Sequence, residues 1–255
     1  MMEIIADVGP GRLLIIWLVV LLASVLRAFT GFGFALAAVP VFSLFIPPTE
    51  SVVLIVLMTL TLSLLSLPTY RGVVAVRPLV PLLVMLLIGT ALGAFLLPLI
   101  SVAQFQLWAG LSVILAGVGL TFFQPSKRFD SPFPGWVAGL VAGLMNGALA
   151  IPGPPLIIYT MLVEREPRRG RAMLMTILLG CSLLALVAYV AAGFFQLQSV
   201  VYFLLSLPAL YAGNTLGNRL FLRHGDALYR RIALLTLLAI GLVTSLRAVL
   251  SGFTA

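Results

Sequence analysis

Two short stretches of the chain combine residue types that can bind a small anion. Their members are Arg27, Thr30, Gly31 and Gly33 in the first stretch, and Asn146, Pro152 and Gly153 in the second. Arginine supplies positive charge, threonine and asparagine offer side-chain hydrogen bonds, and a helix broken at Gly or Pro leaves backbone groups exposed. Where a new helix starts after such a break, its free N–H groups and its positive dipole end attract anions. The chemistry indicated is reversible binding of an anion, with charge pairing assigned to arginine and hydrogen bonding to threonine and asparagine.

Arg27 lies well inside an apolar run, where a charge costs at least ~2.5 kcal/mol and therefore needs a partner or a wet cavity. The alternative is a long side chain that reaches a lipid headgroup. Asn146 occupies the corresponding position in the second stretch, one helical turn before its break. Thr30 either joins the same pocket or bonds back to its own helix. Asn214 and Asn218 are weaker candidates that could equally bond between helices.

The elements that carry these residues are membrane-spanning in character. Of the 255 residues, 62% are hydrophobic and 9% are charged, against about 25% charged residues in a soluble domain. Clusters of charge, Pro and Gly delimit apolar segments at residues 13–46, 51–69, 78–99, 102–123, 133–163, 171–194, 198–218 and 229–250. The composition predicts an all-α integral membrane protein.

Two of these segments, 13–46 and 133–163, exceed the length of a single crossing. Each would be about 50 Å long as a straight helix, and each has helix-breaking residues near its middle, at 30–33 and 150–155. In lipid, a break of this kind is tolerated where it is buried or lines a cavity. We expect each long segment to form two half-helices joined by a turn, re-entrant or as a full hairpin.

The chain contains an internal repeat. An offset of 119 residues places Gly31 to Gly33 on Ala150 to Pro152, and with a few inserted residues 89–93 falls on 213–217. The prediction is therefore two repeats, residues 1–124 and 125–255, each with one broken segment and three further spans. For the glycines at 89, 93, 213 and 217, close helix packing is the favoured role.

Basic residues indicate how the two halves are oriented. They follow the second and fourth segments in the first half, but the fifth and seventh segments in the second half. These residues are Arg71, Arg77, Lys127, Arg128, Arg165, Arg168, Arg169, Arg171, Arg219, Arg223, Arg230 and Arg231. If all of them are cytoplasmic, the halves have inverted topology. The alternative is eight plain crossings with parallel halves, which would leave about half of the basic loops outside.

Several classes of function are disfavoured. The net charge of +8 comes from these loops and does not call for nucleic acid. The seven carboxylates all fall in termini or loops, so no acidic relay supports proton or sodium coupling, and the membrane potential alone can drive anion export at ~2.3 kcal/mol per charge per 100 mV. The lone His224 and the lone Cys181 offer no metal site and no redox pair, and no nucleotide-binding Gly-rich loop is present. We expect no cofactor, no metal and no enzymatic activity.

The ordered set of motifs resembles the TauE/SafE sulfite exporter family over nearly the whole chain. The motifs are Gly31-Phe32-Gly33 followed by Pro40, the turn at 70–74, the Gly-rich stretches at 89–93 and 143–147, and the run 152–155. The resemblance implies export of sulfite or of organosulfonates such as sulfoacetate or sulfolactate, with the substrate at the two breaks.

These inferences predict a multi-pass protein of a bacterial-type inner membrane, whose partners are a small anion and the lipid bilayer. A homo-oligomer is left open beside the monomer. Transport would use alternating access around a midplane site between the two broken segments. The rival functions are an anion channel, an importer of another small organic anion, and a membrane-embedded enzyme or structural subunit.

Overall fold

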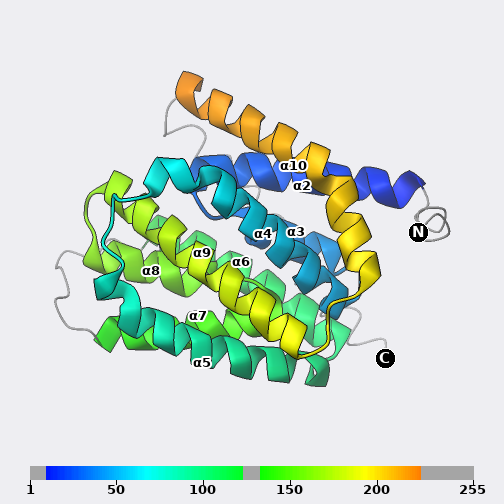
Figure 1. Ribbon diagram of the computed structural model, residues 1–255, viewed down its shortest axis with the longest axis horizontal. Helices are drawn as coiled ribbons and strands as arrows, with labels where there is room; N and C mark the ends of the chain where they lie inside the picture. Colours follow the sequence, from blue (N-terminus) through cyan, green and yellow to red (C-terminus); the bar gives the residue numbers. More distant parts are fainter. Residues whose placement is uncertain (1–9, 123–132, 225–255) are drawn as a thin grey trace.

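The computed structural model describes residues 10–122 and 133–224, and within these ranges the chain is helical (Figure 1). The α-helices are α2 (Pro10–Thr30), α3 (Phe34–Phe42), α4 (Pro48–Tyr70), α5 (Val80–Leu96), α6 (Val102–Phe122), α7 (Phe133–Leu149), α8 (Gly153–Val163), α9 (Pro167–Ala191) and α10 (Leu197–His224). Two 3₁₀ turns, Arg77–Leu79 and Leu97–Leu99, extend α5 at its ends. The predicted all-α class is confirmed.

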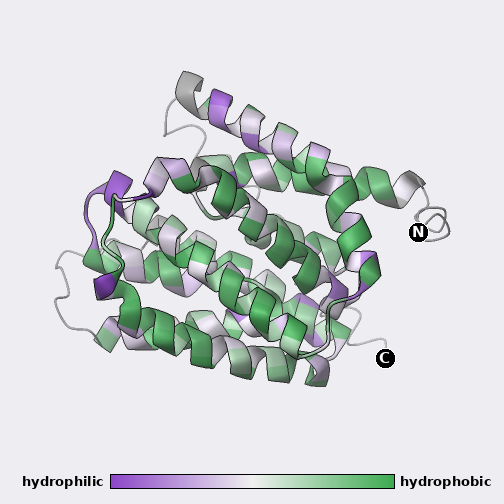
Figure 2. Cartoon of the chain, viewed as in Figure 1, coloured by the Kyte–Doolittle hydropathy of each residue, from purple (hydrophilic) through white to green (hydrophobic). Residues whose placement is uncertain are grey.

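The helices have the length and the outer surface of a membrane protein. Four stretches in the described ranges are long and apolar enough to cross a bilayer, namely Pro48–Tyr70, Arg77–Leu99, Arg168–Ala191 and Leu197–Leu220. Large apolar side chains point outward from several helices, among them Phe95, Val187 and Leu22, which are 74%, 67% and 65% exposed. Figure 2 shows that hydrophobic residues predominate on α4 and α9, whereas the last part of α10 is pale or hydrophilic. An outer surface of this kind suits contact with lipid tails.

The two long segments are each interrupted where the sequence predicts. Helix α2 ends at Thr30 and α7 ends at Leu149, and in both cases the next residue has left-handed backbone: Gly31 with φ 81° and Ala150 with φ 56°. The N–H of each donates to the carbonyl four residues earlier, at 2.7 Å and 2.9 Å respectively, which is a left-handed helix cap. A new helix begins three residues later in each copy. The breaks thus correspond under the 119-residue offset.

Glycines bring four of the helices together as two close pairs. Gly89 and Gly93 of α5 lie against the backbone of α7, and Gly213 and Gly217 of α10 lie against α2. Both pairs run parallel, because positions further along one helix contact positions further along its partner. A Cβ added at Gly213 would stand only 2.5 Å from the Leu21 carbonyl oxygen. Here small residues allow backbone contact between helices.

Helices α4 and α9 lie between these two pairs (Figure 1). They run antiparallel: Tyr70, the last residue of α4, packs with Ala172 and Met175 near the start of α9. Both broken segments therefore face a central pair of long helices.

Some predicted boundaries differ from the structure. Helix α9 starts at Pro167 instead of 171, and α10 continues to His224 instead of ending at 218. Helix α9 begins at a proline, which is favoured in the first helical turn. Charged residues in an end turn do not stop a helix, so basic residues that we assigned to loops lie on the ends of helices instead. The predicted segment 229–250 and the boundary between the halves at 124 lie outside the described residues.

Candidate functional site

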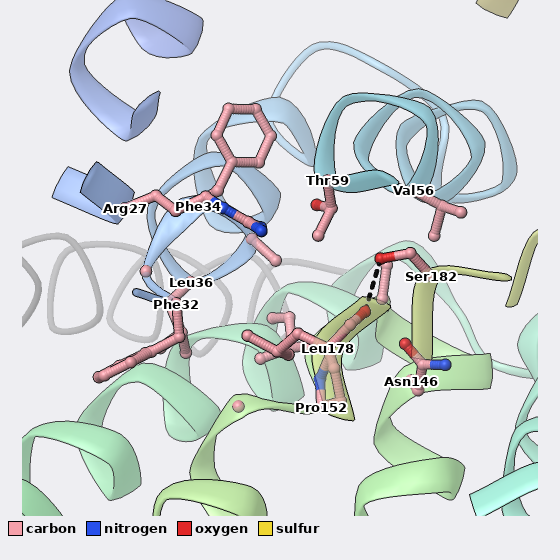
Figure 3. A pocket seen from close by; sticks show the side chains of 15 residues that line it. Arg27, Phe32, Phe34, Leu36, Val56, Thr59, Asn146, Pro152, Leu178 and Ser182 are labelled. Atoms are coloured by element: carbon pink, nitrogen blue, oxygen red, sulfur yellow. Dashed lines mark hydrogen bonds between the residues drawn. The ribbon is translucent and has the colours of Figure 1, made fainter. Parts of the chain in front are cut away.

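A small pocket lies where the two breaks meet α4 and α9 (Figure 3). Its lining residues are Arg27, Phe32, Gly33, Phe34, Ala35, Leu36, Val56, Thr59, Asn146, Ala150, Ile151, Pro152, Gly153, Leu178 and Ser182. Val56 and Thr59 are near the middle of the 23-residue α4, and Leu178 and Ser182 are near the middle of the 25-residue α9. The pocket is therefore about as far from one end of these helices as from the other.

Arg27 brings a positive charge to this pocket. Its residue is 2% exposed, and its Nη2 donates a hydrogen bond of 2.7 Å to Ser63 Oγ on α4. Tyr70 in turn donates to the Ser63 carbonyl at 2.8 Å. Because Arg27 is enclosed by protein, it does not reach outward to a headgroup. Among the described residues, the buried Nε of Arg27 has no hydrogen-bond partner, so one edge of the guanidinium is available to a ligand.

Asn146 occupies the equivalent position in the second half but offers different chemistry. Its Nδ2 donates to the Cys181 carbonyl at 2.9 Å and to Thr90 Oγ1 at 3.2 Å. A carbonyl can only accept, so this contact sets the orientation of the amide. Figure 3 shows the Asn146 side-chain oxygen turned toward the pocket. Asn146 thus presents an acceptor, which suits a water or a substrate hydroxyl.

The end of α7 is held by a buried tyrosine that sequence reasoning missed. Tyr189 of α9 is 0% exposed and its hydroxyl donates to the carbonyls of Asn146 at 2.7 Å and Gly147 at 3.0 Å. These carbonyls belong to the last turn of α7, where intrahelical donors run out. An isolated tyrosine in an apolar run carries no sequence signal of this role.

The half-helices that leave the two breaks differ in what their first turns can donate. In α3 the N–H of Ala37 bonds to the Gly33 carbonyl at 3.0 Å, which leaves the N–H groups of Ala35 and Leu36 without an acceptor inside the helix. In α8 the second and third residues are Pro154 and Pro155, which have no N–H. The first half therefore supplies both the cation and the richer set of backbone donors.

The structure brings most of the predicted site residues together. Arg27, Gly33, Asn146, Pro152 and Gly153 line the pocket. The Thr30 side chain lies outside the described set, although its backbone ends α2.

Gly31 is not among the lining residues. It caps α2, and a Cβ there would stand 3.0 Å from Arg171 Cγ of α9. Arg171 Nη2 also donates to the Ala28 carbonyl at 2.6 Å, so the predicted loop residue Arg171 holds the end of α2. Positive charge at a helix C-terminus is favourable. At this position Gly31 and Arg171 support the break and do not enter the pocket.

Sequence reasoning also missed two polar lining residues, Thr59 and Ser182. Ser182 Oγ donates to the Leu178 carbonyl at 2.9 Å, whereas the buried Thr59 Oγ1 has no partner among the described residues. Within the described ranges, no group of three or more His, Cys, Asp or Glu residues is placed to hold a metal ion. The site is apolar, with one cation and a few hydroxyl and amide groups.

Comparison with known proteins identifies the family of this chain. Neither the curated proteins nor the solved structures contain a match to this chain. The family model of the sulfite exporter TauE/SafE matches residues 16–244, which include both breaks and the helices that surround the pocket. By this match over most of its length, the chain belongs to the sulfite exporter TauE/SafE family.

Proposed function

We propose that this protein exports sulfite or a small organosulfonate by alternating access at the pocket between its two broken helices. Family membership makes it a multi-pass membrane transporter and not an enzyme. The observation that carries the proposal is Arg27, a 2% exposed cation that lines a mainly apolar pocket and whose buried Nε has no hydrogen-bond partner among the described residues. A buried charge inside a membrane protein marks a binding site or an ion pathway.

We also propose that residues 1–124 and 125–255 form two repeats with inverted topology. Support comes from the breaks, which correspond in position and in cap geometry. Further support comes from reciprocal packing. Helix α2 of the first half pairs in parallel with α10 of the second, and α7 of the second half pairs in parallel with α5 of the first. Helices α4 and α9, which follow the two broken segments, run antiparallel. Exchange between two equivalent arrangements is the usual basis of alternating access in such folds.

In this proposal the placement of arginines gives the orientation of the protein in the membrane, and the membrane potential then gives the direction of transport. Arg71, Arg165, Arg168 and Arg169 lie where α4 ends and α9 begins, and Arg12 starts α2 at the opposite end. By the positive-inside rule, the end rich in arginine faces the cytoplasm of a bacterial-type inner membrane. An anion that leaves through a site without a buried carboxylate relay gains ~2.3 kcal/mol per charge per 100 mV.

The size of the pocket favours a transporter over an open channel. The cavity has a volume of about 30 Å³, which is room for about two water molecules. A sulfur oxyanion with its contacts needs more space, so the pocket must expand to load substrate. A site that must widen around its substrate is typical of a transporter that changes conformation in each cycle.

The direct test is flux of radiolabelled sulfite in proteoliposomes that contain the purified full-length protein. We expect saturable flux that is accelerated by sulfite on the trans side, as carriers show. Gly153 offers a matched pair of variants: a Cβ there would meet Leu36 Cδ1 at an ordinary 3.5 Å, so Gly153→Ala should be tolerated. Gly153→Leu extends into the pocket and should reduce flux at least tenfold.

Other results would reject parts of this proposal. Steady unitary current without trans acceleration would identify a channel. Equal flux for the Leu and Ala variants at Gly153 would show that the substrate does not pass through this pocket. Absence of flux for sulfite and for all organosulfonates tested would reject the substrate class.

A further inference from the structure

Thr59 and Ser51 both lie in α4 and have a buried hydroxyl without a partner among the described residues, and of the two Thr59 lines the pocket. Thr61 donates to the Leu57 carbonyl and Ser63 donates to the Thr59 carbonyl, each at 2.8 Å and each four residues back along α4. This back-bonding is how a buried hydroxyl in an apolar helix normally finds a partner. Thr59 Oγ1 is buried without any partner in the described part of the protein, and Thr59 lines the pocket. Its hydroxyl therefore has unused hydrogen-bonding capacity beside the pocket.

A second unpartnered donor stands close by. Arg27 Nη2 is held by Ser63, which lies one helical turn after Thr59 on the same face of α4. Arg27 Nε is also buried without a partner. Figure 3 shows the Arg27 guanidinium directed toward the part of the pocket where Thr59 lies. Two groups with unused donor capacity, one charged and one neutral, thus face the same small space.

We propose that Thr59 is a substrate-binding residue, and that its hydroxyl and the Nε–H of Arg27 together hold one oxyanion head group. This inference rests on the proposed function and specifies the substrate end that enters this side of the pocket. Two separate donors suit a head group that carries several acceptor oxygens on one centre, as sulfite and sulfonate groups do. Phe34 and Val56 line the same pocket and exclude water around the head group, which strengthens both hydrogen bonds.

Both groups are buried without a partner in the described part of the protein, which carries a cost. A buried polar group without a partner destabilises the folded state, and its replacement by an apolar group of the same shape is neutral or stabilising. Thr59→Val removes the hydroxyl while it nearly preserves the shape of the side chain. A binding role and a structural role for the hydroxyl therefore predict opposite changes in the stability of the ligand-free protein.

The experiment compares Thr59→Val, Thr59→Ser and the control Thr61→Val in the full-length protein. Thr61 has a hydroxyl on the same helix but does not appear among the pocket residues, and its partner is its own backbone. Two measurements are made: KM for sulfite in proteoliposomes, and the thermal midpoint in detergent with and without sulfite.

We expect Thr59→Val to raise KM about tenfold, the usual effect of a lost hydrogen bond to a charged group. Its thermal midpoint without sulfite should equal or exceed that of the unmodified protein, and the added stability from sulfite should shrink. Thr59→Ser should retain both the KM and the response to sulfite, and Thr61→Val should leave KM unchanged.

A KM for Thr59→Val within twofold of the unmodified protein would overturn the role of Thr59 while leaving the transport proposal intact. A lower thermal midpoint for the ligand-free Val variant would show that the hydroxyl supports the fold, and would also overturn it. If the unmodified protein neither transports sulfite or sulfonates nor responds to them in the thermal assay, this inference and the proposed function both fail.

Discussion

Replacement of Arg27 by methionine tests the charge on which the proposed site depends. Methionine keeps the unbranched stem of the side chain as far as the position of Nε, but removes the cation, the bond to Ser63 and the unpartnered Nε–H. A hydrogen bond to a charged group contributes about 1.5–3 kcal/mol, so binding of an anion should weaken by about 10- to 150-fold. Without ligand, the loss of a charge that is 2% exposed removes an unfavourable term of ~2.5–3.5 kcal/mol on insertion scales.

The measurement is initial sulfite flux over a range of concentrations in proteoliposomes, normalised to folded protein. Arg27→Met should raise KM by the factor above, and its thermal midpoint without ligand should not fall. Arg27→Lys keeps a charge but cannot donate to Ser63 and to substrate through a planar fork. Its KM should therefore lie between the KM of the unmodified protein and that of Arg27→Met. If Arg27→Met keeps its KM within twofold while its thermal midpoint falls by several degrees, Arg27 is structural and the reasoning is refuted.

Two further predictions concern the scaffold around the pocket. A Cβ at Gly143 would stand 2.5 Å from a carbonyl oxygen and 2.9 Å from a Cα of α5; Gly143→Ala should therefore cost about 1–3 kcal/mol as overpacking. Gly170→Ala, where the nearest atom is 3.9 Å away, should be neutral or stabilising because alanine favours helix. Thermal midpoints in detergent compare the Gly143 and Gly170 variants, and equal midpoints would contradict the close packing of α7 on α5. Tyr189→Phe should destabilise by about 1–3 kcal/mol, since it removes the hydroxyl donor from two buried carbonyls, of which that of Asn146 keeps its bond from the Ala150 N–H. The variant should hardly change KM, and a stable variant with a much higher KM would instead place the hydroxyl at the substrate.

Several features of the fold could be predicted from local sequence. Hydrophobic length set the spans, and the residue types at 30–33 and 150–155 predicted both breaks, which the structure has at Gly31 and Ala150. Gly31 is the common choice for left-handed backbone, but Ala150 is not. Its position was still predicted because the prolines that follow at 152, 154 and 155 disfavour continuation of α7.

The lining of the pocket was predictable only in part. Arg27 and Asn146 stood out because polar groups are costly in an apolar run. Thr59 did not, because α4 is apolar on all sides and its pattern does not indicate which face meets lipid and which meets protein. Thr61 and Ser63 share its helix and chemistry, and only the direction in which each hydroxyl bonds separates them. That direction depends on what surrounds α4.

The sequence by itself determined that the chain is a helical membrane protein with two equivalent broken segments, because span length and helix breaking are local properties of the backbone. It also singled out Arg27, since the cost of a charge in hydrocarbon needs no knowledge of neighbours. Tertiary structure alone decided that Asn146 presents an acceptor, that Arg171 holds the end of α2 and that Thr59 faces the pocket with a free hydroxyl. Each of these depends on a partner distant in the chain, and helix packing brings that partner into reach.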